Sequence, residues 1–272
     1  MRMFGMEIKE INVKSCLVKS KLSDYVINPY LGCQHGCKYC YATFMKRFQN
    51  IKGTWGEFCY ARMNCPELLK KELDRAKSGH IWMSSVTDAY QPLEAKYKLT
   101  RQILEVLTNH PRKNEFSLEI LTKSALIRRD FDLIKKLNAE IGCSINSLDA
   151  NAARIIEPFG SPPSERVKVL KDAQKEGIKV YGFISPVIPG ITKLEEIFKE
   201  LSFCSYVWVE LLNTKPDVMA RLMPTIRENF PDAVDKIGFY VSNPKLYYEE
   251  IEMEVRRLEK KYKLPVKDIV VH

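Results

Sequence analysis

The stretch from Asn28 to Ala42 reads NPYLGCQHGCKYCYA and places Cys33, Cys37 and Cys40 at a C-x3-C-x2-C spacing. Thiolates gathered this closely bind either zinc or an iron–sulfur cluster. A structural zinc site usually has four protein ligands, often in C-x2-C pairs, and no second pair of matching spacing occurs here. His35 could supply a fourth ligand, so zinc stays an alternative. Three thiolates on a four-iron cluster would leave one iron open, as a catalytic site requires.

Around this stretch, short apolar runs alternate with segments of helical periodicity. The runs predicted as strands are 25–31, 80–86, 116–122, 140–145, 179–187 and 206–212. Apolar residues at helical spacing predict helices around 99–107, 167–173, 194–201 and 247–262. Such alternation is typical of parallel strands joined by helical crossovers. We therefore expect an α/β fold, a partial TIM-type (β/α)₆ barrel, with functional side chains at the carboxyl ends of the strands.

The composition is that of a folded globular protein. With 272 residues, 45% of them hydrophobic and 28% charged, wholesale disorder is excluded. We expect a single domain over residues 1–272, with a core at about 25–215 and a helical extension, 216–272, packed on it. The sequence contains no run of about 18 apolar residues, so we expect no membrane span. The first ten residues lack a signal-peptide core, so we expect a cytoplasmic protein with no membrane partner.

The net charge of +9 permits a nucleic-acid partner. Basic residues gather on both sides of the cysteines, with Tyr and Phe among them: Lys14, Lys19, Lys21, Lys38, Lys46, Arg47 and Lys52. Such a surface could follow phosphates and stack bases. An ordinary solvated lysine surface has the same composition, so both interpretations stay open.

The cysteine stretch resembles the cluster motif of the radical S-adenosylmethionine (radical SAM) enzymes, with Tyr39 in the aromatic position. The longer string is similar to the spore-photolyase-like branch of that superfamily, a group related to DNA repair photolyases. Similarity to that branch continues at 84–94, 121–124, 129–130, 144–145, 157–158, 164–166 and 186–190. The resemblance implies a radical SAM core, in agreement with the six strand–helix units.

The resemblance also implies the chemistry. It places a [4Fe–4S] cluster on Cys33, Cys37 and Cys40, with S-adenosylmethionine on the open iron. Reductive cleavage would give methionine and a 5′-deoxyadenosyl radical, which takes a hydrogen atom from a substrate. We expect that substrate to be nucleic acid or a nucleotide, and the electron donor to be a low-potential protein of the flavodoxin or ferredoxin type. Modification of a peptide or small metabolite is one alternative. A non-enzymatic, zinc-stabilised nucleic-acid-binding protein is another.

Polar residues at the predicted strand ends match the branch and are expected to contact S-adenosylmethionine: Ser84, Ser85, Thr87, Asp88, Lys123, Ser144 and Arg166. Each has a structural alternative. Ser and Asp are common turn and helix-cap residues. Lys123 could be solvated, and Glu157 and Arg166 could form a salt bridge beneath the site.

Two tyrosines beside Cys40, Tyr39 and Tyr41, match tyrosines of the branch and are the expected catalytic residues. They could relay a hydrogen atom or pack around the cluster. The lesion-repairing members use a cysteine as hydrogen donor near the second-strand motif, where this chain has Ser85. We therefore do not expect thymine-dimer repair, unless Cys59 or Cys65 approaches the site. The alternative for these two cysteines is burial as small apolar residues.

Overall fold

The computed structural model describes the whole chain except residues 1, 4–5, 49–50 and 52. Its internal contacts divide it into two compact units. The first unit comprises residues 1–36, 42–142 and 172–179, and the second comprises residues 37–41, 143–171 and 180–272. The expectation of one domain with an extension packed on its core stays a prediction.

The first unit contains a mainly parallel sheet. Its strands, in hydrogen-bonded order, are β3 (Val18–Lys19), β4 (Tyr25–Ile27), β7 (Gly79–Met83), β8 (Phe116–Thr122) and β9 (Asn138–Ser144, whose last two residues belong to the second unit). The pairs β4–β7 and β7–β8 are parallel, and β3 is antiparallel to β4 at the edge. The carboxyl ends of β4, β7 and β8 therefore meet at one edge, as the predicted fold requires.

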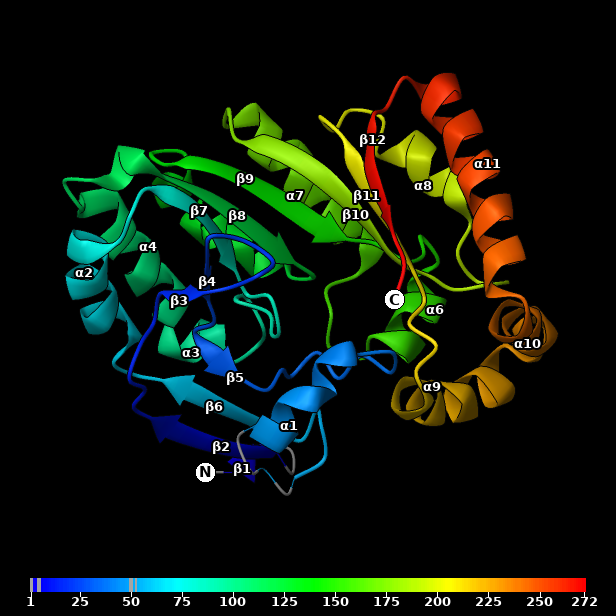
Figure 1. Cartoon of the computed structure of the whole chain (residues 1–272), viewed down its shortest axis with the longest axis horizontal. Helices are drawn as coiled ribbons and strands as arrows, with labels where there is room; N and C mark the ends of the chain where they lie inside the picture. The colour runs from blue at the N-terminus through cyan, green and yellow to red at the C-terminus, as the bar shows by residue number, and fades with distance from the viewer. Residues whose placement is uncertain (1, 4–5, 49–50, 52) are drawn as a thin grey trace. The chain divides into compact units, whose positions relative to one another are not determined.

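The same unit contains a second, smaller sheet that the sequence did not predict. Its strands, in order, are β1 (Arg2–Met3), β2 (Met6–Ile11), β6 (Phe58–Arg62) and β5 (Tyr30–Leu31), coloured blue to cyan in Figure 1. The pair β2–β6 is parallel, and β5 pairs antiparallel with β6. Because Asn28 and Pro29 separate β4 from β5, the run 25–31 that was expected as one strand belongs to two sheets.

The helical segments of the first unit are η1 (Tyr41–Phe44, whose first residue belongs to the second unit), α1 (Met45–Phe48), α2 (Cys65–Arg75), α3 (Glu94–Tyr97), α4 (Leu99–Asn109), η2 (Lys113–Glu115), η3 (Ala125–Asp130) and α5 (Phe131–Ile134). The predicted spacing in α4 is confirmed, because Leu99, Ile103, Leu104 and Leu107 are all buried. Helix α2 packs against α4 (Figure 1).

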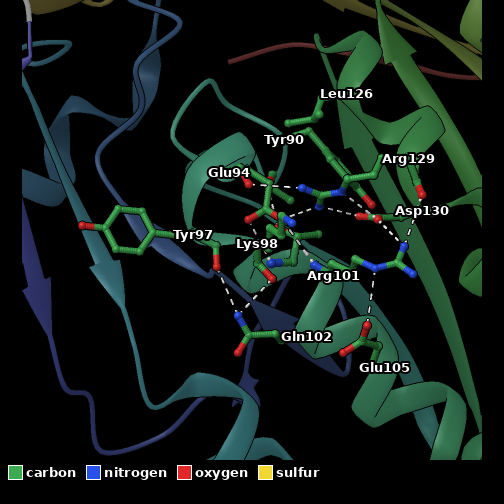
Figure 2. A network of polar contacts seen from close by, with 12 residues as sticks. Tyr90, Glu94, Tyr97, Lys98, Arg101, Gln102, Glu105, Leu126, Arg129 and Asp130 are labelled. Carbon is green, nitrogen blue, oxygen red and sulfur yellow. Dashed lines mark hydrogen bonds and ion pairs between the residues drawn. The ribbon is translucent and has the colours of Figure 1, made fainter.

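A buried ionic network connects α3, α4 and η3 (Figure 2). Glu94 and Asp130 are fully buried, and the Arg129 guanidinium binds both carboxylates at 2.5 and 2.7 Å. Arg101 pairs with Asp130 at 2.9 Å, and the Tyr30 hydroxyl donates to Glu94 at 2.5 Å. Buried charges are tolerated only when paired in this way. The network fixes the segment that follows the 84–94 motif.

The second unit contains the parallel strands β10 (Lys179–Val187), β11 (Val207–Leu211) and β12 (Val266–Val270), in that order. Its helices are α6 (Ala150–Ile156), α7 (Pro163–Lys175, whose last residues belong to the first unit), α8 (Leu194–Glu200), α9 (Pro216–Asn229), η4 (Pro231–Ala233), α10 (Val234–Ser242) and α11 (Pro244–Tyr262). Strand β10 has its predicted bounds. The segment 216–272, expected as a helical extension, consists mainly of helices and also contains β12, which extends the sheet. Among the described helices, none is long and apolar enough to cross a membrane.

Candidate cofactor site at the cysteine loop

The cysteine loop, residues 32–40, runs from the end of β5 to the start of η1. Cys33, Cys37 and Cys40 are partly exposed, whereas the other five cysteines are buried. Gly32 has φ +84°, and a Cβ there would lie 2.5 Å from the Phe58 carbonyl oxygen, so this position requires glycine. Within the part of the chain that the structure describes, no three His, Cys, Asp or Glu side chains are arranged to hold a single metal ion.

In the first unit, His35 and Asp88 hold the beginning of the loop. The His35 Nε2 lies 3.0 Å from the Asp88 Oδ2, and both side chains are buried. Asp88 also accepts hydrogen bonds from the Lys123 and Tyr90 amides and the Thr122 hydroxyl, each at 2.8 Å. Burial alone would raise the pKa of the Asp88 carboxyl, but the charge of His35 and these hydrogen bonds outweigh it and lower the pKa.

The Gly32 carbonyl is a second attachment point. It accepts hydrogen bonds from the Thr87 hydroxyl at 2.7 Å and from Gln91 Nε2 at 3.3 Å. Gln91 Oε1 in turn accepts from the Gln34 amide at 2.8 Å and from the Cys59 thiol at 3.1 Å. Thr87, Gln91 and Cys59 thus fix the backbone on which Cys33 sits.

Two serines follow β7, and their surroundings differ. Ser85 receives a long hydrogen bond, 3.5 Å, from Asn28 Nδ2. Ser84 has φ +70°, a left-handed conformation that is strained for a residue with a Cβ. Its hydroxyl is buried and has no hydrogen-bond partner among the described residues. Strain together with an unsatisfied buried hydroxyl is typical of a ligand-binding position.

In the second unit, Glu157 holds the end of the loop. The buried Tyr39 hydroxyl donates to Glu157 Oε1, and the Arg166 Nη1 lies 2.5 Å from Glu157 Oε2. Arg166 is 1% exposed and also donates to the carbonyls of Ser161 and Ser144, at 2.7 and 2.9 Å. Burial and the neighbouring Glu157 carboxylate raise the pKa of Tyr39, so its phenol stays protonated. The salt bridge between Glu157 and Arg166 that was considered from the sequence is therefore present.

Backbone groups of this half are also held. The Lys38 amide donates to the Ile156 carbonyl at 2.9 Å, and the Arg221 guanidinium donates to the Cys40 carbonyl. Nearby, Asn146 Nδ2 donates to Glu157 at 3.3 Å, while its Oδ1 is buried and lacks a partner in the described residues. Ser144, the last residue of β9, is 2% exposed.

Tyr41 differs from Tyr39. It is 40% exposed, and its ring stacks on that of His272 at 6.3 Å between centroids. His272 Nε2 lies 2.9 Å from Glu210 Oε1, and the Ser185 hydroxyl donates to the other oxygen of Glu210. Tyr41 thus lies beside a histidine–carboxylate pair at the carboxyl end of β11.

The structure places the predicted residues in two roles. Thr87, Asp88 and Arg166 contact the loop or its supports, and Ser84 is left with an unsatisfied hydroxyl. Whether Ser84, Ser85, Thr87, Asp88, Lys123, Ser144 and Arg166 contact S-adenosylmethionine stays a prediction. Sequence reasoning did not identify Gln91 or Glu210, and it considered His35 only as a zinc ligand. Gln91 lies within the 84–94 motif, which could have identified it, whereas the partners of His35 and Glu210 come from distant segments of the chain.

The other cysteines and lysines considered from the sequence differ in exposure. Cys59 and Cys65 are fully buried. Lys14, Lys19 and Lys21 are exposed and Lys38 and Lys46 partly exposed, while Lys52 and the side chain of Arg47 lie outside the described residues.

Comparison with known proteins identifies relatives along most of the chain. A family model described as the radical SAM superfamily matches residues 27–201. An uncharacterized protein of Methanocaldococcus jannaschii is 38% identical over 98% of both chains. Uncharacterized proteins of Acidianus two-tailed virus and Mycobacterium tuberculosis are 31% and 27% identical over 68% and 72% of this chain, and the matches span 63% and 61% of their own lengths.

Solved structures give the same fold. Spore photoproduct lyase, complexed with dinucleoside spore photoproduct, matches with a TM-score of 0.67 and 15% identity over 96% of this chain and 81% of that chain. A radical SAM methyltransferase from Sphaerobacter thermophilus matches with a TM-score of 0.52 and 13% identity over 93% of this chain and 67% of that chain. At these identities the likeness shows the fold, and the predicted α/β partial barrel is confirmed.

Proposed function

This chain belongs to the radical SAM superfamily, and we propose on that premise that it is an enzyme that cleaves S-adenosylmethionine and modifies a nucleic acid or nucleotide. The observation that carries the proposal is the cysteine loop. Its three thiols are partly exposed, and both halves of its backbone are attached to buried carboxylates.

Cys33, Cys37 and Cys40 fit a [4Fe–4S] cluster by the chemistry of their donors. Thiolates are the usual ligands of such clusters, and a set of three leaves one iron available to another molecule. The five other cysteines are buried, so the accessible thiols are those of the motif. When bound and reduced, the cluster would supply the electron that cleaves S-adenosylmethionine and generates a 5′-deoxyadenosyl radical.

The protein's own contribution begins with shielding and rigidity. Tyr30 and Leu31 are buried at the start of the loop, and an apolar surrounding favours a low reduction potential. Within the first unit Asp88 fixes His35, and within the second unit Glu157 fixes Tyr39, so each half of the loop is held locally. Such attachment orders the thiol or thiols of that half before a metal group binds.

Two unsatisfied polar atoms support cofactor binding. The Ser84 hydroxyl in one unit and the Asn146 Oδ1 in the other are buried without partners among the described residues. Leaving such a group unpaired costs about 1–3 kcal/mol, which a bound ligand recovers. We propose that each atom binds a polar group of S-adenosylmethionine, assisted by Ser85, Lys123 and Ser144. Thr87, Asp88 and Arg166 act instead as positioning residues.

The substrate class is inferred from chemistry and from one structural neighbour. The net charge of +9 favours a polyanion, and the neighbour's bound molecule is a dinucleoside photoproduct. Ser85 follows β7, and Cys59 and Cys65 are buried at 0% exposure, so we do not propose thymine-dimer repair. Tyr41, which is exposed beside Cys40, is the proposed hydrogen-transfer residue, and a flavodoxin- or ferredoxin-type protein is the proposed electron donor.

Anaerobic reconstitution with iron and sulfide, followed by reduction in the presence of S-adenosylmethionine, tests the cofactor. We expect a four-iron absorption and paramagnetic signature and release of 5′-deoxyadenosine. Uptake of zinc alone, with no 5′-deoxyadenosine, would instead support the non-enzymatic zinc-protein alternative. Incubation with deuterated DNA, RNA, nucleotides and peptides then tests the substrate, because deuterium enters 5′-deoxyadenosine only from the correct class.

A further inference from the structure

A groove in the second unit is lined by residues other than those of the cysteine loop and its supports. It has a volume of about 650 Å³ and lies between the turn that joins β10 to α8, helix α10 and helix α11, which Figure 1 labels. Ligand sites commonly have volumes of about 300–1,000 Å³. The apolar part of this α10–α11 groove is formed by Val187, Leu194, Phe239, Tyr247 and Ile251.

The walls of the groove are held together within the second unit. A Cβ on Gly190, in the turn after β10, would lie 3.1 Å from the Cα of Ala233, so the turn packs directly on η4, which leads into α10. The Glu195 carboxylate of α8 pairs with Arg257 of α11 at 2.9 Å and also with Lys261. The groove is therefore preformed, which lowers the ordering cost of binding.

Three carboxylates on the rim of the groove have no counter-ion. Asp235 on α10 and Glu250 and Glu254 on α11 make no ion pair or side-chain hydrogen bond with the described residues. By contrast, the rim residues Lys193 and Glu196 pair with each other at 3.4 Å. The part of the chain that the structure describes holds no set of acidic side chains arranged for a single metal ion. A cation at this rim would therefore be an organic one.

Exposed apolar side chains accompany these carboxylates on both helices. Phe239 is exposed and follows Asp235 by one turn of α10. On α11, the exposed Leu246 precedes Glu250 by one turn, and the exposed Met253 follows it by three residues. Side chains three or four residues apart share one face of a helix. Each helix thus presents apolar and acidic groups together, a combination that solvation alone does not require.

The negative charge of the groove is local. Glu250 and Glu254 are four residues apart on α11, a spacing at which like charges repel. Burial and the neighbouring Tyr240 raise the pKa of Tyr247, and the charges of the two glutamates raise it further. The stem of Lys236 lies against Gly190. Because the whole chain carries a net charge of +9, this acidic groove is an exception on a basic protein.

We propose that the α10–α11 groove docks a basic, amphipathic segment of a partner protein. An aliphatic side chain of that segment packs against Phe239, and its Lys or Arg side chains pair with the rim carboxylates of Asp235, Glu250 and Glu254. Amphipathic helices bind apolar grooves in this way, and complementary charge on the rim selects the partner. The sign of the rim disfavours nucleic acid, so this site is separate from the proposed substrate.

Three designed peptides test the chemistry of the occupant. The basic probe is a fluorescein-labelled amphipathic helix built from Leu and Lys. One matched peptide has Glu in place of each Lys, and the other has Gln in place of each Leu. We expect fluorescence anisotropy with the reconstituted full-length protein to show saturable binding of the basic probe alone, weakening as salt rises. The net charge of +9 repels this probe from most of the surface. Equal binding of either matched peptide would overturn the proposal.

Variants of the groove locate the binding. Glu250→Gln/Glu254→Gln should weaken binding of the basic probe by roughly three- to tenfold and reduce its salt dependence. Phe239→Ala should weaken binding without changing the salt dependence. The matched control, Glu228→Gln/Glu249→Gln, removes two charges from α9 and α11 outside the groove and should bind as the wild type does. Circular dichroism verifies folding. An equal loss in the control, or none in the groove variants, would contradict the assignment.

Sedimentation without peptide tests whether a second copy of this chain occupies the groove. We expect wild type and Glu250→Gln/Glu254→Gln to have the same mass in solution. A wild-type dimer that dissociates in the variant would assign the groove to a second copy and overturn the proposal. Because none of these measurements uses S-adenosylmethionine, they are independent of the proposed function.

Discussion

The two halves of the cysteine loop are held by buried carboxylates with different partners. Asp88 faces an imidazole, that of His35, whereas Glu157 faces a guanidinium, that of Arg166. The Asp88 carboxylate also accepts hydrogen bonds from the Lys123 amide and the Thr122 hydroxyl, whereas the Glu157 carboxylate is paired with a buried guanidinium. A guanidinium stays charged throughout the pH range in which proteins are folded. The two halves should consequently respond differently to mutation and pH.

The largest effect on activity should come from replacing the loop's cysteines, which lie in both halves of the loop. We expect Cys33→Ala, Cys37→Ala and Cys40→Ala each to abolish 5′-deoxyadenosine formation and to reduce bound iron strongly. The reason is that each half contributes at least one ligand that nothing else in the loop replaces. Iron analysis and chromatography of the nucleoside measure the result. Full turnover in any of the three variants would separate that half of the loop from the cluster.

The half of the loop that is held by Glu157 and Arg166 should lose more stability when its carboxylate is neutralised. Glu157→Gln leaves Arg166 buried at 1% exposure without its counter-ion. Removing one partner of a buried pair typically costs about 3–5 kcal/mol in the free energy of unfolding. Denaturant titration of the apoprotein measures this loss. The double variant Glu157→Gln/Arg166→Met should recover part of this loss. No recovery would mean that the unpaired charge of Arg166 is not its cause.

The half of the loop that is held by Asp88 should lose stability in acid. The pKa of Asp88 is lowered in the folded protein, so its stabilisation is complete above the unfolded value, about 4, and is lost as pH falls toward the folded pKa. Asp88→Asn should therefore lower the free energy of unfolding by about 2 kcal/mol at pH 7 and by less at pH 3. Denaturant titrations at the two pH values test this. A loss that stays equal at both would show that Asp88 is not ionised in the folded state.

The smallest effects on stability should come from Tyr39→Phe and Tyr41→Phe, and the two variants should differ. Tyr39→Phe removes the hydroxyl bound to Glu157 and should cost about 1–3 kcal/mol. Tyr41→Phe, at an exposed position, should change stability by less than about 0.5 kcal/mol. It should instead lower product formation relative to 5′-deoxyadenosine release if Tyr41 transfers the hydrogen. Unchanged product yield in Tyr41→Phe would remove that role.

Local patterns predicted the parts of this site that lie close together in sequence. The cysteine spacing identified the loop, and the bounds of β8 and β10 matched their apolar runs residue for residue. Partner choice was not predictable. Asp88 was expected to face a cofactor, yet four protein groups contact its carboxylate, because His35 and Lys123 arrive from other segments. Strand β12 was missed because a five-residue run after a long helix carries little periodicity.

The contribution of the ionic network of Figure 2 to stability should depend on temperature. Glu94 and Asp130 are both fully buried and share the Arg129 guanidinium. Hydration of charged groups becomes less favourable as temperature rises, so the penalty for burying them falls. The network should therefore stabilise the first unit more, relative to its apolar contacts, near the melting temperature than at 25 °C. The segment after the 84–94 motif should accordingly be among the last parts of this unit to lose its structure on heating.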